Sequence, residues 1–146
     1  MRILVLQGPN LNMLGKREAG HYGTLTLDEI HRKMSDRAVS LPCDLEFYQS
    51  NHEGDLVDKI QSERDNIDGI ILNPAGLTGV GYSLRDAIED SGVPTIEVHL
   101  SNIHAREAFR SHSVISAVAT GQVVGLRWRG YLAALEILAS IVDEEG

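Results

Sequence analysis

The segment Gly15–Gly23, "GKREAGHYG", contains a tyrosine, Tyr22, and two cationic residues, Lys16 and Arg17. A phenol is ordinarily a poor base at neutral pH, but a neighbouring cation stabilises the phenolate. Arg17 suits this task because a guanidinium is always charged. A phenolate can remove a proton next to a ketone, so Tyr22 is a candidate general base. The alternative is a tyrosine that packs its ring on the domain and leaves its hydroxyl in water.

A second candidate for proton transfer is the pair Glu97 and His99 in "TIEVHL". Alternation along a strand puts both side chains on the same face. A carboxylate beside an imidazole fixes its tautomer and stabilises the imidazolium, which suits a proton donor. The alternative is a structural pair that ties down the end of a strand.

The segment "SNIHAREAF", residues 101–109, predicts a short helix capped by Ser101 or Asn102. Arg106 and Arg110 are four residues apart, so on one helix they would share a face. Backbone N–H groups at the start of this helix could hold a small carboxylate. The alternative is a plain cap with solvated arginines.

Apolar runs and amphipathic runs alternate along the rest of the chain. Strands are expected at 2–7, 44–50, 68–73, 95–100 and 122–126, and further helices at 26–41, 55–65, 83–91 and 131–142. Thr26 is the expected N-cap of its helix, and Gly92 is expected to end the third of these helices. This order predicts an α/β fold in one domain, residues 1–146: a flavodoxin-like, doubly wound, five-stranded parallel sheet with helices on both faces.

The unusual polar residues follow the predicted strands. Asn10 and the Tyr22 segment come after the first strand, Ser50-Asn51-His52-Glu53 follows the second, and Asn73 ends the third. His99 lies near the end of the fourth strand, and Ser101 follows it. The carboxyl ends of parallel strands form the crevice where ligands bind. We therefore expect these side chains to converge on one site.

Composition excludes several function classes. The net charge of −8 argues against nucleic acid or an anionic membrane as the main partner. A single cysteine allows no internal disulfide, and no apolar run is long enough for a signal peptide or a membrane span, so we expect a cytoplasmic protein. No zinc-ligand spacing is present, and no lysine suits a Schiff-base mechanism.

The motifs "LQGPNLNMLGKREAGHYG", "ILNPAGLT", "LRDA", "IEVHLSNIHAREAFR" and "GLRWRGYLAAL" resemble type II 3-dehydroquinate dehydratase of the shikimate pathway, from end to end of the chain. The resemblance implies a flavodoxin-like domain assembled as a homododecamer, a tetramer of trimers. It implies anti elimination of water from 3-dehydroquinate, through an enolate, to give 3-dehydroshikimate. It also implies that no metal, cofactor or covalent imine takes part.

The resemblance implies a role for each matching residue. Tyr22 would be the base, Arg17 would favour its phenolate, and His99 would protonate the departing hydroxyl with Glu97 beside it. The backbone N–H groups of Leu100 and Ser101 would hold the substrate carboxylate. The other matching positions would contact or support the substrate site: Asn10, Asn73, Arg106, Arg110, and Asp86 delivered from a neighbouring subunit.

Two stretches depart from the family's pattern. Gly79-Val80-Gly81 stands where the family usually has His-Thr-Ser, and that histidine contacts a substrate hydroxyl. Restoring the three residues is expected to tighten substrate binding, unless the site is rebuilt around the glycine. Trp128 lies between two arginines and has no functional interpretation from the sequence. Two other functions stay open: a flavodoxin-like small-ligand-binding module, and a non-catalytic relative.

Overall fold

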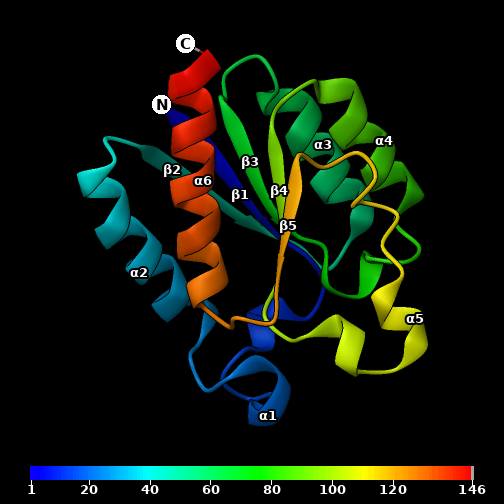
Figure 1. Ribbon diagram of the computed structural model, residues 1–146. Coiled ribbons are helices and arrows are strands. Elements are labelled where there is room, and N and C mark those ends of the chain that lie inside the picture. Colours follow the sequence, from blue (N-terminus) through cyan, green and yellow to red (C-terminus); the bar gives the residue numbers. More distant parts are fainter. Residues whose placement is uncertain (146) are drawn as a thin grey trace.

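The computed structural model describes residues 1–145 and contains a five-stranded, all-parallel sheet (Figure 1). The strands lie in the order β2-β1-β3-β4-β5. Their bounds are Arg2–Gln7 for β1, Asp44–Gln49 for β2, Gly69–Asn73 for β3, Thr95–His99 for β4 and Gly121–Val124 for β5. This is the flavodoxin-like order expected from the alternating pattern. The predicted strands are correct to within a residue or two at each end.

Helices cover both faces of the sheet (Figure 1). The helices α2, Leu27–Ser40, and α6, Arg129–Glu145, pack on one face, and α3, Glu53–Glu63, and α4, Tyr82–Ser91, pack on the other. The pleat of β1 shows why: Ile3 and Val5 belong to the first core cluster, whereas Leu4 and Leu6 belong to the second. A strand buried on both faces is apolar along its interior, as Ile3, Leu4, Val5 and Leu6 are in "RILVLQ".

Two predicted helix boundaries are confirmed by their caps. The Thr26 side chain accepts a hydrogen bond from the Glu29 N–H, and the Glu29 carboxylate accepts one from the Thr26 N–H, which completes a capping box. Gly92 ends α4 with a left-handed backbone, φ 66°. Within residues 1–145, no helix is long and apolar enough to cross a membrane.

The carboxyl ends of the strands meet at the lower edge of the molecule in Figure 1. Two short helices lie there: α1, Ala19–Tyr22, within the Tyr22 segment, and α5, Ala108–Ser111. Short 3-10 turns follow three of the strands, at Leu11–Met13, Ala75–Leu77 and Ile103–Ala105. The site is therefore built from short irregular segments on a rigid sheet.

The prediction of one helix over 101–109 is wrong. Asn102 caps only the 3-10 turn Ile103–Ala105, and α5 begins separately at Ala108. Arg106 lies between them with an extended backbone, φ −110° and ψ −162°. Arg106 and Arg110 therefore do not share a helical face. Tertiary contacts of the Arg106 side chain, described below, outweigh the local helical preference.

Candidate active site

A cavity of about 450 Å³ opens at the carboxyl ends of the strands. Its size suits a small ligand. Nine of the residues predicted for the site line it: Asn10, Arg17, Tyr22, Asn73, His99, Leu100, Ser101, Arg106 and Arg110. Glu97 lies behind His99, and Asp86 does not line the cavity. The predicted convergence is therefore confirmed for the residues after β1, β3 and β4, whereas residues 50–53, after β2, do not line the cavity.

Two cations converge on the Tyr22 hydroxyl. Nη2 of Arg17 donates a hydrogen bond to it over 2.9 Å, and Nη1 of Arg106 donates another, also over 2.9 Å. The Arg17 guanidinium also lies over the ring, 3.8 Å from its centroid. Two charged donors stabilise a phenolate oxygen far more than a neutral phenol. The predicted cationic surroundings of Tyr22 are present: Arg17 supplies one cation from the segment, and Arg106 supplies the other from outside it.

Burial keeps the Arg106 side chain in position for its hydrogen bond to Tyr22. Its side chain is only 10% exposed, and Nη1 also donates to the Ser101 hydroxyl over 3.2 Å. Its Nε is buried and has no hydrogen-bond partner among the described residues. Arg106 is 84 residues from Tyr22 in sequence. No local pattern could reveal this pairing, because it forms only when β4 and the Tyr22 segment meet at one edge of the sheet.

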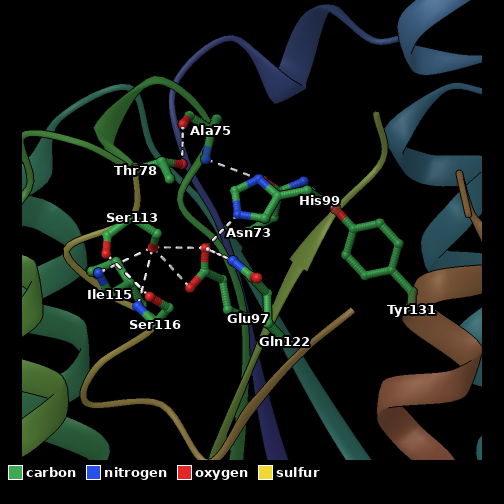
Figure 2. Close-up of polar contacts among 10 residues, drawn as sticks. All are labelled: Asn73, Ala75, Thr78, Glu97, His99, Ser113, Ile115, Ser116, Gln122 and Tyr131. Carbon is green, nitrogen blue, oxygen red and sulfur yellow. Dashed lines mark hydrogen bonds and ion pairs between the residues drawn. The ribbon is translucent and has the colours of Figure 1, made fainter. Parts of the chain in front are cut away.

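On the other side of the site, Glu97 and His99 are in direct contact, as the alternation in β4 predicts (Figure 2). His99 Nε2 faces the Glu97 carboxylate, which is fully buried. The second ring nitrogen, Nδ1, is not used in this contact. The imidazole therefore has one nitrogen fixed by a carboxylate while its other nitrogen remains for a ligand.

Two further residues donate hydrogen bonds to Glu97 (Figure 2). The Ser113 hydroxyl lies 3.0 Å from both carboxylate oxygens, and Gln122 Nε2 donates over 3.0 Å. The Ser113 oxygen also accepts from the N–H groups of Ile115 and Ser116, so its only hydrogen points at Glu97. These donors fix the Glu97 carboxylate in place beside His99.

No pattern in the sequence pointed to Ser113. For Gln122 a weak signal existed, because the residue opposite Glu97 in the β4–β5 register is Gln122. A fully buried carboxylate must have donors around it, and an adjacent parallel strand is the natural place to seek one.

Asn73 is the last residue of β3, and Asn10 precedes the 3-10 turn that follows β1. Asn73 is buried, its Nδ2 donates to the Tyr131 hydroxyl over 2.9 Å, and its Oδ1 accepts from the Ala75 N–H over 3.0 Å. Asn10 has a left-handed backbone, φ 69°, a conformation that asparagine tolerates better than most residues. Its N–H donates to Asn51 Oδ1 over 2.9 Å.

Comparison with known proteins identifies the chain's relatives. The family model described as "Dehydroquinase class II" matches residues 1–139. The chain belongs to the class II dehydroquinase family. The resemblance found in the motifs is thereby confirmed over nearly the whole chain.

Named dehydroquinases are close in sequence and structure. The chain is 57% identical to the 3-dehydroquinate dehydratase of Herpetosiphon aurantiacus over 136 residues, covering 93% of this chain and 94% of that protein. It is 56% identical to the 3-dehydroquinate dehydratase of Roseiflexus castenholzii over 138 residues, covering 94% and 88%. The crystal structure of type II dehydroquinase from Butyrivibrio crossotus superposes with a TM-score of 0.92 at 44% identity, covering 94% and 97%.

Two predicted positions of this dehydroquinase lie at the margin of the site. Asp86 is on α4 with its side chain 67% exposed, and its nearest ionic partner is Arg85 at 3.9 Å. Arg110 lines the cavity, and its Nε donates to the Glu107 carboxylate. Asp86 therefore lies outside the lining of this cavity.

Gly79 lies against the loop that follows α5. A Cβ atom at this position would come within 3.2 Å of the His112 carbonyl oxygen and 3.5 Å of that of Phe109. At Gly81 a Cβ would lie 2.8 Å from the Leu77 carbonyl oxygen, which no side chain tolerates without a backbone shift. The cavity wall is thus packed around these glycines. His112, which the sequence did not single out, lines the cavity beside Gly79.

Trp128 lies between two cations, with Lys33 Nζ and the Arg129 guanidinium each 4.5 Å from its rings. These contacts are cation–π interactions, so the tryptophan has a structural role. Among residues 1–145, no group of three or more His, Cys, Asp or Glu side chains is arranged to hold a metal ion.

Proposed function

We propose that this chain removes water from 3-dehydroquinate to give 3-dehydroshikimate, with Tyr22 as the base and His99 as the acid, in one catalytic domain. The activity follows from membership of the family and from close relatives that carry the name 3-dehydroquinate dehydratase. The observation that supports the division of roles is the placement of charge. The phenol has two cationic neighbours, and the imidazole has a buried carboxylate neighbour.

In the first step the Tyr22 phenolate takes the proton from the carbon next to the substrate ketone. Arg17 and Arg106 hold the phenolate before the transfer, because each donates a charged hydrogen bond to its oxygen. As the proton moves, negative charge passes from Tyr22 to the substrate as an enolate. The two cations remain in place and lie close to that charge, so the site is organised in advance for the intermediate.

In the second step the enolate expels the hydroxyl on the neighbouring carbon, and His99 gives that oxygen a proton so that it leaves as water. A hydroxide ion is a poor leaving group, and proton donation by a positioned acid typically contributes 10²- to 10⁴-fold. Glu97 stabilises the imidazolium before the transfer. Ser113 and Gln122 hold Glu97 in place beside His99.

The remaining cavity residues would orient the substrate. The N–H groups of Leu100 and Ser101, at the carboxyl end of β4, are proposed to hold the substrate carboxylate. Arg110 is proposed to contact a ring hydroxyl, and Asn10 and Asn73 to contact the ring or a bound water. All five residues line the cavity.

A neighbouring subunit is proposed to complete the site. Three large apolar side chains near the mouth of the cavity are exposed: Val80, Tyr82 and Phe109, at 65%, 59% and 68%. An apolar patch of this kind is typical of a surface that is covered in an assembly. Asp86, on the same helix as Tyr82, would then reach a neighbouring cavity within a trimer of a dodecamer.

The test is an assay of the wild-type protein with 3-dehydroquinate, which follows the conjugated enone product in the near ultraviolet. Turnover is expected to survive a metal chelator, and borohydride added with substrate is expected to leave the enzyme active. A protein that binds substrate without turnover would instead be a non-catalytic relative. A bound chromophore with an idle Tyr22 would point to a flavodoxin-like ligand-binding module. Trapping of a reduced lysine adduct would overturn the imine-free mechanism.

A further inference from the structure

The amide of Asn73 is fixed by two partners of opposite kind. Its nitrogen donates to the Tyr131 hydroxyl over 2.9 Å, and its oxygen accepts from the Ala75 N–H over 3.0 Å (Figure 2). Since the side chain lines the cavity, the orientation of this amide decides where a ligand meets a donor and where it meets an acceptor. An asparagine amide can otherwise turn over and exchange these two atoms.

Tyr131 can only accept from Asn73, because its single hydrogen is used elsewhere. It comes from α6, is fully buried, and donates to Gln7 Oε1 over 2.7 Å. Gln7 ends β1 directly opposite Asn73 in the β1–β3 register. The other amide atom of Gln7, Nε2, lies 3.3 Å from His31 Nε2 on α2. A chain of three hydrogen bonds therefore runs from the cavity through the core to His31.

The three hydrogen bonds all donate in the same direction, away from the cavity. Asn73 donates to Tyr131, Tyr131 donates to Gln7, and Gln7 donates to a neutral His31 ring. If the Asn73 amide turned over, its oxygen would face a hydroxyl whose hydrogen is already used. Its nitrogen would meanwhile face the Ala75 N–H. Both new contacts would be mismatched inside a buried site, where unpaired polar groups are costly.

We propose that Tyr131 is a positioning residue, which sets the orientation of the Asn73 amide and so defines the donor and acceptor that the cavity offers to substrate. The proposal rests on the proposed function for its kinetic consequence. Its structural part, that the Tyr131 hydroxyl holds Asn73 in one orientation, stands independently. Tyr131 itself does not line the cavity, so its effect on turnover passes through Asn73.

The protonation states of Tyr131 and His31 support this assignment. Burial raises the pKa of Tyr131 well above that of an ordinary phenol, so its hydroxyl keeps its hydrogen. Burial lowers the pKa of His31 to about 4, so near neutral pH its ring can accept the hydrogen of Gln7. The two titratable groups of this series, Tyr131 and His31, are thus uncharged near neutral pH.

The kinetic test is a double-mutant cycle with Tyr131→Phe and Asn73→Ala. Tyr131→Phe is expected to lower kcat/KM about 10-fold, since small displacements of positioning groups have effects of this order. The change should fall on the same parameter, kcat or KM, that Asn73→Ala affects. In the Asn73→Ala background, Tyr131→Phe should have less than a two-fold effect, about the error of such cycles. The matched control is Tyr48→Phe, which removes a hydroxyl outside this chain and should leave kcat/KM unchanged.

A second measurement does not depend on turnover. In the wild-type protein the ¹⁵N-labelled side-chain amide of Asn73 should give one sharp pair of signals with a slowly exchanging hydrogen. In Tyr131→Phe that protection should be lost. If Tyr131→Phe does not fold, Gln7→Met serves instead, because it removes the acceptor that fixes the direction of the Tyr131 hydroxyl.

The outcomes separate this proposal from the proposed function. Absence of wild-type turnover would overturn the proposed function, while the amide signals would still decide the orientation of Asn73. Unchanged Asn73 signals in both variants would overturn the positioning proposal. Loss of protection of the Asn73 amide in Tyr131→Phe with an unchanged kcat/KM would also overturn it. So would an effect of Tyr131→Phe on kcat/KM that is equal in the wild-type and Asn73→Ala backgrounds.

Discussion

The acid side and the base side of the site are held in different ways. His99 and Glu97 are on β4, a strand in the interior of the sheet, and are buried, and Glu97 accepts hydrogen bonds from Ser113 and Gln122. Tyr22 is on a four-residue helix between Gly15 and Gly23, both with positive φ, and is only partly buried. The acid is thus fixed by the scaffold, whereas the base lies on a short segment and is held by two charges, Arg17 and Arg106. The sheet thus gives the acid rigid support, whereas the short segment leaves the base accessible.

The largest effect is expected on the base side. Tyr22→Phe removes the phenolate but keeps the ring contacts, so turnover should fall about 100- to 10,000-fold while stability and assembly are unchanged. Steady-state kinetics and a thermal melt check both parts. The control is Tyr48→Phe, at a position that does not line the cavity. Retention of more than about a tenth of wild-type turnover would show that Tyr22 is not the base.

On the acid side a comparable change should affect stability as well as rate. Glu97→Gln puts an amide where the buried carboxylate accepts from Ser113 and Gln122. Turnover should fall about 100-fold, and stability by about 1–3 kcal/mol, because one amide hydrogen is left facing donors. Kinetics together with urea unfolding measure the two effects. A fall in turnover with an unchanged free energy of unfolding would show that the acid side is not held more firmly by the scaffold than the base side.

The same contrast explains what the sequence could predict. Strand alternation placed Glu97 and His99 together, and the apolar runs gave the sheet and its carboxyl-end crevice, because these features follow from short-range periodicity. Arg106 and Ser113 could not be assigned this way. Arg106 pairs with a residue 84 positions away, and Ser113 reaches Glu97 from the loop before β5. The wrong helix over 101–109 has the same cause, since the contacts of Arg106 interrupt it.

The folding stability of the protein should also depend on pH, through His31 on α2. The pKa of His31 is lowered from 6.5 to about 4 by burial, so between these values the unfolded chain binds a proton that the folded chain does not. Stability should therefore fall as pH drops from about 6.5 to 4. The full shift corresponds to about 3 kcal/mol, reduced to about 1–2 kcal/mol because the ring is partly exposed.

Urea unfolding at pH 7 and pH 4.5 measures this loss, with His31→Phe as the comparison. Phenylalanine preserves the stacking on Phe47, whose ring centroid is 4.0 Å away, but cannot titrate. The variant is expected to lose less stability on acidification than the wild type does. An equal loss in the two proteins would show that His31 is not responsible.

The smallest effect is expected where the cavity wall departs from the family's pattern. A triple variant, Gly79→His with Val80→Thr and Gly81→Ser, restores the usual residues. The sequence alone favours tighter binding by several-fold. The structure favours the opposite result, because a Cβ at Gly81 would lie 2.8 Å from the Leu77 carbonyl oxygen and one at Gly79 would press on that of His112.

We therefore expect kcat/KM of the triple variant to be unchanged or a few-fold lower than that of the wild type. Val80→Thr alone is the matched control, since Val80 is exposed and needs no backbone shift. A several-fold gain in kcat/KM would show that the cavity wall adapts to the histidine, and the account of a wall packed around glycine would be wrong.

The central claim is that two separate groups, Tyr22 and His99, carry out the two proton transfers on opposite faces of the substrate ring. The most direct test uses 3-dehydroquinate labelled with deuterium at one or the other hydrogen of the carbon next to the ketone. The enone product of each labelled substrate is then analysed by mass spectrometry. Our account predicts loss of deuterium only from the position anti to the departing hydroxyl. Loss from the syn position would contradict it.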